Sequence, residues 1–397
     1  MHYYDRERQK IGRWYEWVIV FWMMLATWMV GQFALTSGFE PILRDLDPER
    51  ANQLGDAMNA DMAALAENPG AALALALGLL VQMIAVPLAA IGLLVHYLGA
   101  RGRGSLITGL IGVFMSLAGL VPLFAANGSF ADSNAILMSV IGLSPFAYAL
   151  MLLTFPAALV GLYWGWTKVQ ERSLTALHTA FAQFRWGRVV QSFLIGWIVL
   201  GGYSVVATAL GLASPRFVFD AGRFVPFAVL SLLLLPVQSA TEEIAVRGFI
   251  NKGLISALGN KWVVFTLTSG LFMALHLANP EARAGADAGI LPIVMSGYFF
   301  FGFAACLMVL IDDGLESAIG VHAANNTFAA IFVNYENSVL PTPSVWQVSA
   351  EPVSDSLSTI VVLLIILALL WVTRGRWLRG PRTEEHPAET ATSRVFR

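Results

Sequence analysis

The amino-acid sequence predicts an all-α polytopic membrane protein, built as a bundle of about ten transmembrane helices. Of the 397 residues, 57% are hydrophobic and only 13% are charged, whereas a soluble domain carries about 25% charged residues. Ten stretches are mostly apolar over roughly the 20 residues that a helix needs to cross a bilayer. The formal net charge of −2 indicates no nucleic-acid partner. A lipid bilayer is therefore the expected surrounding of this chain.

The expected spans follow one another along the chain, near residues 15–37, 71–98, 105–126, 141–166, 189–212, 225–250, 262–278, 290–311, 314–334 and 356–373. The fourth is the least regular, because Pro145 near its start can break or kink a helix. In the acidic loop 37–70, the sequence Asp47-Pro48-Glu49 is a typical start for a short amphipathic helix. The basic, aromatic loop 168–188 is expected to lie along the inner membrane surface.

The distribution of lysine and arginine predicts the orientation of these helices. Basic residues gather in the N-terminal segment, in the loops near 101–103, 168–188 and 252–261, and in the tail from residue 374 onward. Loops rich in lysine and arginine stay on the cytoplasmic side. We therefore expect an integral protein of the plasma (inner) membrane with both termini in the cytoplasm, and a first apolar run that is a span rather than a cleaved signal peptide.

Three regions are expected. Residues 1–188 form an N-terminal transmembrane region of about four spans, residues 189–374 form a second transmembrane region, and the tail 375–397 is disordered because it is rich in proline and acidic residues. The single cysteine, Cys306, lies in an apolar run and has no second cysteine for an intrachain disulfide. Asp312 and Asp313 are expected in a solvated turn at the membrane edge.

Polar groups interrupt the second region in three short helical patches. The first contains Glu242, Glu243 and Arg247. Glu243 and Arg247 are four residues apart and can pair on one helix face, whereas Glu242 points about 100° away from Glu243. One carboxylate can thus be neutralised locally while the other is left for a different partner. A structural cluster of charges at a helix end is the alternative interpretation.

The second patch contains Phe272 and His276, which share a helix face. A single histidine at a helix end is usually an interfacial residue. The distance of His276 from a turn instead favours a position beside another polar group. Gly259-Asn260 is a strong turn signal, and Glu242 and His276 each lie seventeen positions from Gly259. In an antiparallel helical hairpin both would lie at a similar depth, about 25 Å from the turn. We therefore expect Glu242 and His276 to lie near one plane.

The third patch contains His322 and Asn326, four residues apart on one face. Both side chains can donate hydrogen bonds, which suits the stabilisation of an oxyanion. Helix-to-helix hydrogen bonding is the alternative, and it is all that we expect of Asn325. Ionisable groups at membrane depth are costly and usually face a functional cavity. The three patches together offer the groups for general acid–base hydrolysis.

Two other catalytic chemistries could use residues of these patches. The sequence has no His-Glu-x-x-His motif, but Glu242, His276 and His322 together could supply two histidines and one carboxylate to a divalent metal. Ser239 lies three residues before Glu242, but neither histidine lies beside it in sequence, so no serine triad is indicated. Attack by water is favoured, with no cofactor expected and metal assistance as the second choice.

At these residues the chain resembles the CAAX-protease and bacteriocin-processing (CPBP) family, which includes prenyl-protein endopeptidases. The resemblance lies in Glu-Glu-x-x-x-Arg at 242–247, Phe-x-x-x-His at 272–276 and His-x-x-x-Asn at 322–326, and covers about 225–332. It implies a four-helix catalytic core in region 189–374. Bacterial members often have an aromatic residue before the arginine, where this chain has Val246.

The resemblance further implies an intramembrane glutamate-dependent endopeptidase acting on a membrane-associated protein or peptide. Glu242 would activate water with the help of His276. His322 and Asn326 would form the oxyanion hole, and Glu243, Arg247 and Phe272 would support them. The alternatives are a metal-dependent protease using the same residues and a non-proteolytic transporter or scaffold that retained the fold, since intramembrane acids and histidines also build proton relays.

Overall fold

The computed structural model describes residues 3–4, 13–99, 102–277, 279–335, 338–349, 352–379 and 381. Nearly all of the regular structure is helical, as the sequence predicts. In the N-terminal region the helices are α1 (Trp14–Thr36), α2 (Phe39–Leu46), α3 (Pro48–Glu67), α4 (Pro69–Leu98), α5 (Arg103–Asn127), the 3₁₀ turn η2 (Gly128–Phe130), α6 (Ala131–Met138), α7 (Val140–Leu143), α8 (Pro145–Lys168) and α9 (Leu174–His178).

The second region begins with α10. Its elements are α10 (Trp186–Ala209), β1 (Arg216–Phe217), α11 (Ala221–Glu243), the π-helix η3 (Ile244–Ile250), α12 (Asn251–Leu258), α13 (Lys261–Leu275), α14 (Pro280–Asp287), α15 (Leu291–Asp312), α16 (Glu316–Ile331), β2 (Val333–Tyr335), β3 (Trp346–Val348), α17 (Pro352–Thr373) and the 3₁₀ helix η4 (Arg374–Arg379). The three strands form one small sheet in the order β1-β3-β2, with β1 antiparallel and β2 parallel to β3.

Each of the ten expected spans corresponds to a helix in the structure. Within the described residues, eight helical stretches are long and apolar enough to cross a membrane: 14–46, 69–98, 103–123, 145–168, 186–209, 221–258, 291–312 and 355–379. The other two expected spans are shorter helices, α13 with 15 residues and α16 with 16. The protein is an all-α polytopic membrane bundle, and its two short members carry two of the three polar patches.

Local sequence signals account for two helix starts that matter for the bundle. Pro145 is the first residue of α8, and the Ser144 hydroxyl accepts a hydrogen bond of 3.2 Å from the Ala147 amide. Proline is favoured at this position because its missing N–H has no partner there. The Asp47 carboxylate caps α3 by accepting from the Arg50 amide at 3.0 Å. The helix start predicted at Asp47 is therefore confirmed, and the break predicted near Pro145 lies between α7 and α8.

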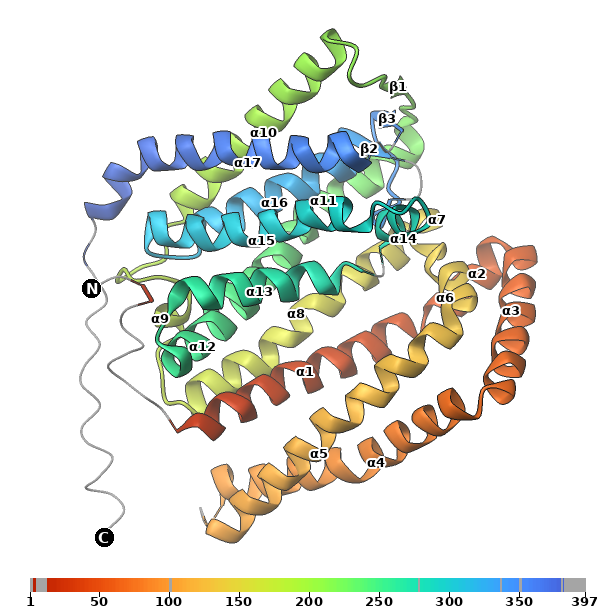
Figure 1. Cartoon of the computed structure of the whole chain (residues 1–397), viewed down its shortest axis with the longest axis vertical. Coiled ribbons are helices and arrows are strands. Elements are labelled where there is room, and N and C mark those ends of the chain that lie inside the picture. The colour runs from red at the N-terminus through yellow and green to blue at the C-terminus, as the bar shows by residue number, and fades with distance from the viewer. Residues whose placement is uncertain are drawn as a thin grey trace.

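The helices pack in neighbouring pairs, with α10 and α17 of the second region on one side of the molecule and α1, α4 and α5 on the other (Figure 1). α4 packs against α5 and α1 against α8, while α16 packs against α10 and α11, and α15 packs against α13 and α17. Figure 1 shows α2, α3, α6 and the strands at one end of the helices, and α9, α12 and the end of α17 at the other. This arrangement brings α11, α13 and α16 together in the bundle.

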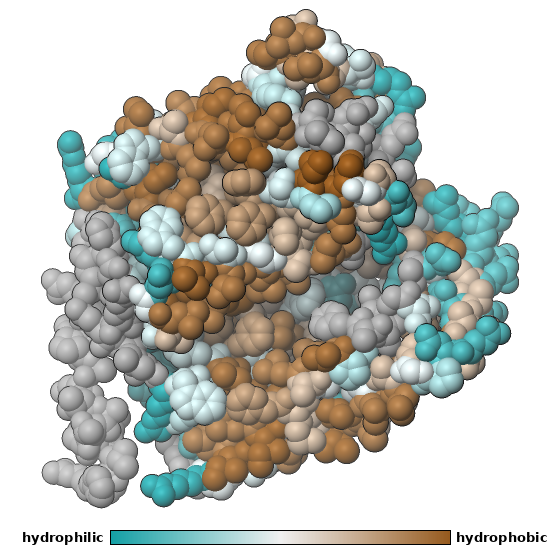
Figure 2. All heavy atoms as spheres, viewed as in Figure 1, coloured by the Kyte–Doolittle hydropathy of each residue, from teal (hydrophilic) through white to brown (hydrophobic). Residues whose placement is uncertain are grey.

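The outer surface is apolar along the helices. In Figure 2 hydrophobic side chains cover the helix faces, and hydrophilic ones gather over the acidic α2 and α3. Phe33, Met83 and Val372 are each at least 75% exposed in the bare protein. Large exposed apolar side chains of this kind are typical of helices that contact lipid.

One expectation from the sequence is wrong here. Asp312 is buried rather than solvated: its carboxylate pairs with the buried Arg188 guanidinium at 2.7 Å. The loop 168–188 also reaches into the bundle, where Arg185 contacts the buried Glu316 carboxylate at 2.8 Å. Sequence alone does not reveal these pairs, because the partners are more than 120 positions apart.

The expected C-terminal disorder is also wrong for residues 375–379. They belong to helix η4, where the Trp377 indole donates a 2.6 Å hydrogen bond to Gln191 on α10. This contact gives the segment a packed partner despite its polar composition. The prediction for residues 382–397 falls outside the described residues.

Candidate functional site

The first polar patch lies where α11 changes into a π-helix. Glu243 is the last residue of α11, and η3 continues from Ile244 to Ile250 with Arg247 in its middle. π-helical turns are rare and occur frequently at functional sites. The carbonyl oxygen of Arg247 accepts a 3.1 Å hydrogen bond from the Tyr4 hydroxyl near the start of the chain. The widened turn is therefore held by a residue from outside the second region.

Glu243 forms the buried centre of this patch. Its Oε1 accepts hydrogen bonds from Arg247 Nη1 at 3.1 Å and from His322 Nδ1 at 2.8 Å. The Arg247 guanidinium also donates to the Gly302 carbonyl at 3.0 Å and lies 4.8 Å from the centroid of the Phe272 ring. The pair between Glu243 and Arg247 that the spacing predicts is thus present, and Phe272 supports it by a cation–π contact.

Glu242 points to a different set of neighbours, as the helical geometry predicts. Its side chain is 23% exposed, whereas that of Glu243 is fully buried. One carboxylate oxygen accepts a hydrogen bond from Gln238 Nε2. The other lies 3.7 Å from His322 Nε2, which is beyond ordinary hydrogen-bond length. Of the two carboxylates, Glu242 is the one that water can reach.

His322 lies between the two glutamates. His322 Nδ1 lies 2.8 Å from Glu243 Oε1, an acceptor, so the proton is assigned to Nδ1. The other ring nitrogen, Nε2, faces Glu242. The rings of Phe272 and Phe301 lie edge-on to the imidazole, with centroids 6.2 and 5.0 Å away. This aromatic surround fixes the orientation of the ring.

Asn326 joins the cluster through Gln238, a residue that the sequence motifs do not include. Asn326 Nδ2 donates to Gln238 Oε1 at 3.0 Å and more weakly to Ser239 Oγ at 3.4 Å. Since Gln238 also donates to Glu242, one amide connects the proposed base with the proposed oxyanion donor. Its position four residues before Glu242 on the same helix face was the signal that could have found it.

His276 ends α13 and is oriented by the backbone and by aromatic rings. Its Nδ1 lies 2.7 Å from the Phe272 carbonyl oxygen, so Nδ1 carries the proton and Nε2 is left as an acceptor. The imidazole stacks on Tyr298 with centroids 4.3 Å apart and an interplanar angle of 26°. The Tyr298 hydroxyl is in turn hydrogen-bonded to Glu281 and Asn279. Tyr298 is the second residue that the sequence motifs missed.

The structure brings the predicted residues into one cluster built from α11, η3, α13 and α16. His276 and His322 both lie beside the Phe272 ring, with centroids 4.6 and 6.2 Å from it. The turn at Gly259, which has a φ of +70°, joins α12 to α13 as the hairpin argument requires. Within the described residues Glu242 contacts Gln238 and His322, and it makes no direct hydrogen bond to His276. The pairing of Glu242 with His276 stays a prediction.

The metal-dependent alternative stays a prediction. Among the residues that the structure describes, no group of three or more His, Cys, Asp or Glu side chains is placed to hold a metal ion. His322 Nδ1 and His276 Nδ1 are engaged by Glu243 and by the Phe272 carbonyl. Nε2 is therefore the nitrogen of each ring through which a metal would be bound.

Comparisons with known proteins agree with the position of the cluster. Residues 224–328 match the family described as type II CAAX prenyl endopeptidase Rce1-like. An uncharacterized protein of Bacillus subtilis, YyaK, is 28% identical over 219 residues, which are 54% of this chain and 71% of that protein. No solved structure matches the chain.

The matched segment begins in α11 and ends in α16, so it contains Glu242, His276, His322 and Asn326 together with the helices that position them. This family supports an intramembrane protease of the CAAX type. Within this segment the chain is similar to the Rce1-like family of type II CAAX prenyl endopeptidases.

Proposed function

We propose that the protein is an intramembrane endopeptidase that hydrolyses a peptide bond of a membrane-associated protein or peptide, with Glu242 as the general base. The observation that carries the proposal is the difference between the two adjacent glutamates. Glu243 is fully buried and accepts from Arg247 and His322, whereas Glu242 is partly exposed and faces His322 Nε2 across 3.7 Å. A water molecule between Glu242 and the carbonyl group of a substrate peptide bond would be the nucleophile.

In the proposed reaction Glu242 removes a proton from water as the oxygen attacks the carbonyl carbon of the peptide bond. The carbonyl oxygen becomes an oxyanion that accepts hydrogen bonds from His322 and Asn326. The tetrahedral intermediate then collapses, the C–N bond breaks, and the proton held by Glu242 passes to the leaving amine. His276 assists through its unprotonated Nε2, which can accept a hydrogen bond from the same water.

The resting contacts define what must change for the oxyanion to be bound. Asn326 Nδ2 has two hydrogens, and the bond to Ser239 at 3.4 Å is the longer and weaker of its two. Releasing that bond frees one donor while the bond to Gln238 keeps the amide in place. His322 must carry a proton on Nε2 to donate there, so the proposed oxyanion hole includes the imidazolium form.

The test uses the purified full-length protein and a fluorogenic peptide that ends in a prenylated CAAX sequence, with the unprenylated peptide alongside it. We expect Glu242→Gln to lower turnover by about 100- to 10,000-fold, the usual contribution of a general base. Glu67→Gln, an exposed acid on α3, is the matched control. Full turnover in Glu242→Gln would refute the role of this residue. If a chelator abolishes wild-type activity and a divalent metal restores it, the metal-dependent alternative would replace the metal-free mechanism.

We further propose that the end of the bundle with α9 and α12 faces the cytoplasm, so that both termini lie there. The excess of lysine and arginine at this end supports the orientation. The native Cys306 is fully buried, so single added cysteines can be labelled in intact cells. Lys168→Cys should resist a membrane-impermeant thiol reagent and Glu67→Cys should react. The reverse labelling would contradict this orientation.

A further inference from the structure

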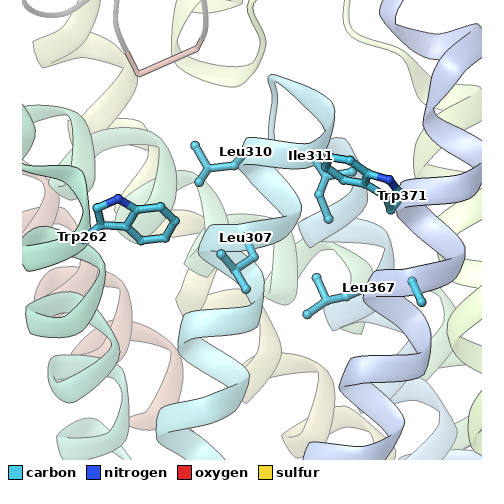
Figure 3. A pocket seen from close by; sticks show the side chains of 7 residues that line it. Trp262, Leu307, Leu310, Ile311, Leu367 and Trp371 are labelled. Atoms are coloured by element: carbon cyan, nitrogen blue, oxygen red, sulfur yellow. The ribbon is translucent and has the colours of Figure 1, made fainter.

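An apolar groove runs along the outer face of α15, between α13 and α17 (Figure 3). α15 packs against both neighbours, and its side chains Leu307, Leu310 and Ile311 line the groove. Leu367 of α17 completes the lining, and Trp262 and Trp371 stand on opposite sides. The hollow has a volume of about 430 Å³, within the range of about 300–1,000 Å³ of ordinary ligand pockets.

The two tryptophans mark the end of the groove that lies near the membrane surface. Trp262 is the second residue of α13, and Trp371 lies two residues before the end of α17. Both side chains are about half exposed, at 51% and 54%. Tryptophan is enriched where the apolar part of a bilayer meets its headgroups. The groove therefore runs inward from the headgroup level along an apolar path.

Two cations lie beside these tryptophans. Lys261 Nζ is 5.7 Å from the centroid of the Trp262 ring, and Arg374 Cζ is 3.1 Å from that of Trp371. Neither cation has a carboxylate partner among the described residues. Asp312, the acid at the end of α15, is already paired with Arg188 at 2.7 Å. The mouth of the groove thus carries two positive charges that no nearby carboxylate neutralises in the part of the chain described.

We propose that this groove binds one anionic phospholipid of the bilayer. One acyl chain lies against Leu307, Leu310 and Leu367, and the phosphate is held at the mouth by Lys261 and Arg374. Basic residues next to the apolar part of a membrane attract anionic headgroups. A ligand that matches both the two cations and the apolar groove carries a negative charge and an apolar chain. A phospholipid has both parts in one molecule. The site is separate from the glutamates and does not depend on the proposed peptidase activity.

The test measures lipid binding to the purified full-length protein by native mass spectrometry, with phosphatidylglycerol and phosphatidylcholine of identical acyl chains as probes. We expect tighter binding of phosphatidylglycerol, by about tenfold or more. Removing one cation should weaken that binding by about fivefold, since each contributes about 1 kcal/mol to attraction for an anionic surface. The double variant Lys261→Gln/Arg374→Gln should show equal binding of the two lipids.

Two further variants separate the groove from general surface charge. Lys168→Gln removes an exposed cation from the end of α8, away from the groove, and should keep the preference for phosphatidylglycerol. Leu307→Trp should fill the groove and weaken the binding of both lipids. Thermal unfolding of each variant checks that it is folded. Equal binding of the two lipids by the wild type, or an unchanged preference in the double variant, would overturn the proposal.

Discussion

At the scale of single residues, two adjacent glutamates divide the work of the site. Glu242 is partly exposed and faces His322 across a gap, and Glu243 is a fully buried partner of both His322 and Arg247. A buried charge pair is costly to break, because the remaining charge stays without compensation. Identical side chains next to each other in sequence are therefore expected to respond differently to the same substitution.

Glu243→Gln should lower stability, by about 3–5 kcal/mol, because it leaves Arg247 uncompensated in the bundle interior. Glu242→Gln should leave stability nearly unchanged while it lowers turnover by about 100- to 10,000-fold. Thermal unfolding in detergent, followed by size-exclusion fluorescence, measures the first effect, and the peptide assay measures the second. Equal losses of stability in the two variants would contradict this division.

Gln238 provides a second prediction at this scale. Its amide connects Glu242 to Asn326, so Gln238→Leu should misplace both groups and lower kcat by about 100-fold, the effect of a displacement of about 1 Å in catalytic groups. KM should change little, because Gln238 contacts the reacting groups rather than the substrate anchor. Gln82→Leu, which removes a similar amide contact between α4 and α5, is the matched control. A kcat of the Gln238→Leu variant equal to that of the wild type would contradict a role for Gln238 in positioning these groups.

At the scale of helices, much of the fold could be predicted from the sequence. The length of an apolar segment and the residues that break a helix are both local properties of the chain. Pro145 and Asp47 begin helices for reasons that their immediate neighbours supply. The spacings of Glu243 with Arg247 and of Phe272 with His276 also placed the right side chains on one face. The helical hairpin at Gly259 followed from the same kind of signal.

What the sequence did not predict depends on contacts between distant helices. Three contacts can be predicted only when the neighbouring helices are known. They are the stack of His276 on Tyr298, the link through Gln238, and the burial of Asp312 against Arg188. The π-helical turn after Glu243 is equally hidden, since no residue type in Ile244–Ile250 requires it. Which side chains pair between helices depends on how the helices pack. A single sequence shows which residues could pair but not which of them do.

The buried pair of Arg188 and Asp312 joins α10 to the end of α15, and Arg188 also donates to the Leu370 carbonyl of α17 at 2.9 Å. Asp312→Asn should destabilise the protein by about 3–5 kcal/mol, because it leaves a buried guanidinium without its counter-charge. The double variant Arg188→Met/Asp312→Leu should recover much of that loss. Unfolding midpoints of the three proteins in one detergent test this, and a double variant as unstable as Asp312→Asn would contradict it.

At the scale of the whole molecule, the bundle surrounds its polar cluster with apolar helices that face lipid. The N-terminal region contributes to this arrangement directly, because Tyr4 donates to the π-helical turn at Arg247. The region matched by the family ends at residue 328, yet α17 covers one side of α15, and η4 is tied to α10 through Trp377. Helices outside the matched segment thus complete the environment of the site.

The shortness of α13 has a consequence for the surrounding bilayer. At 15 residues, this helix measures about 22 Å along its axis, less than the hydrocarbon thickness of about 30 Å. Its side chains Leu267, Leu271 and Leu275 are exposed, so lipid beside it must thin, at a cost of fractions of a kcal/mol per Å of hydrophobic mismatch. The bilayer is therefore expected to be thinnest beside the helix that leads to His276.

Turnover should therefore depend on acyl-chain length. In vesicles of phosphatidylcholine with monounsaturated chains, we expect kcat to fall as the chains lengthen from 14 to about 22 carbons, since a thicker bilayer raises the mismatch at α13. Substrate partitioning into each vesicle is measured separately as the control. A kcat that is constant across the series would contradict an effect of the mismatch at α13 on the site. A falling kcat would make bilayer thickness a determinant of where in a cell this protein works best.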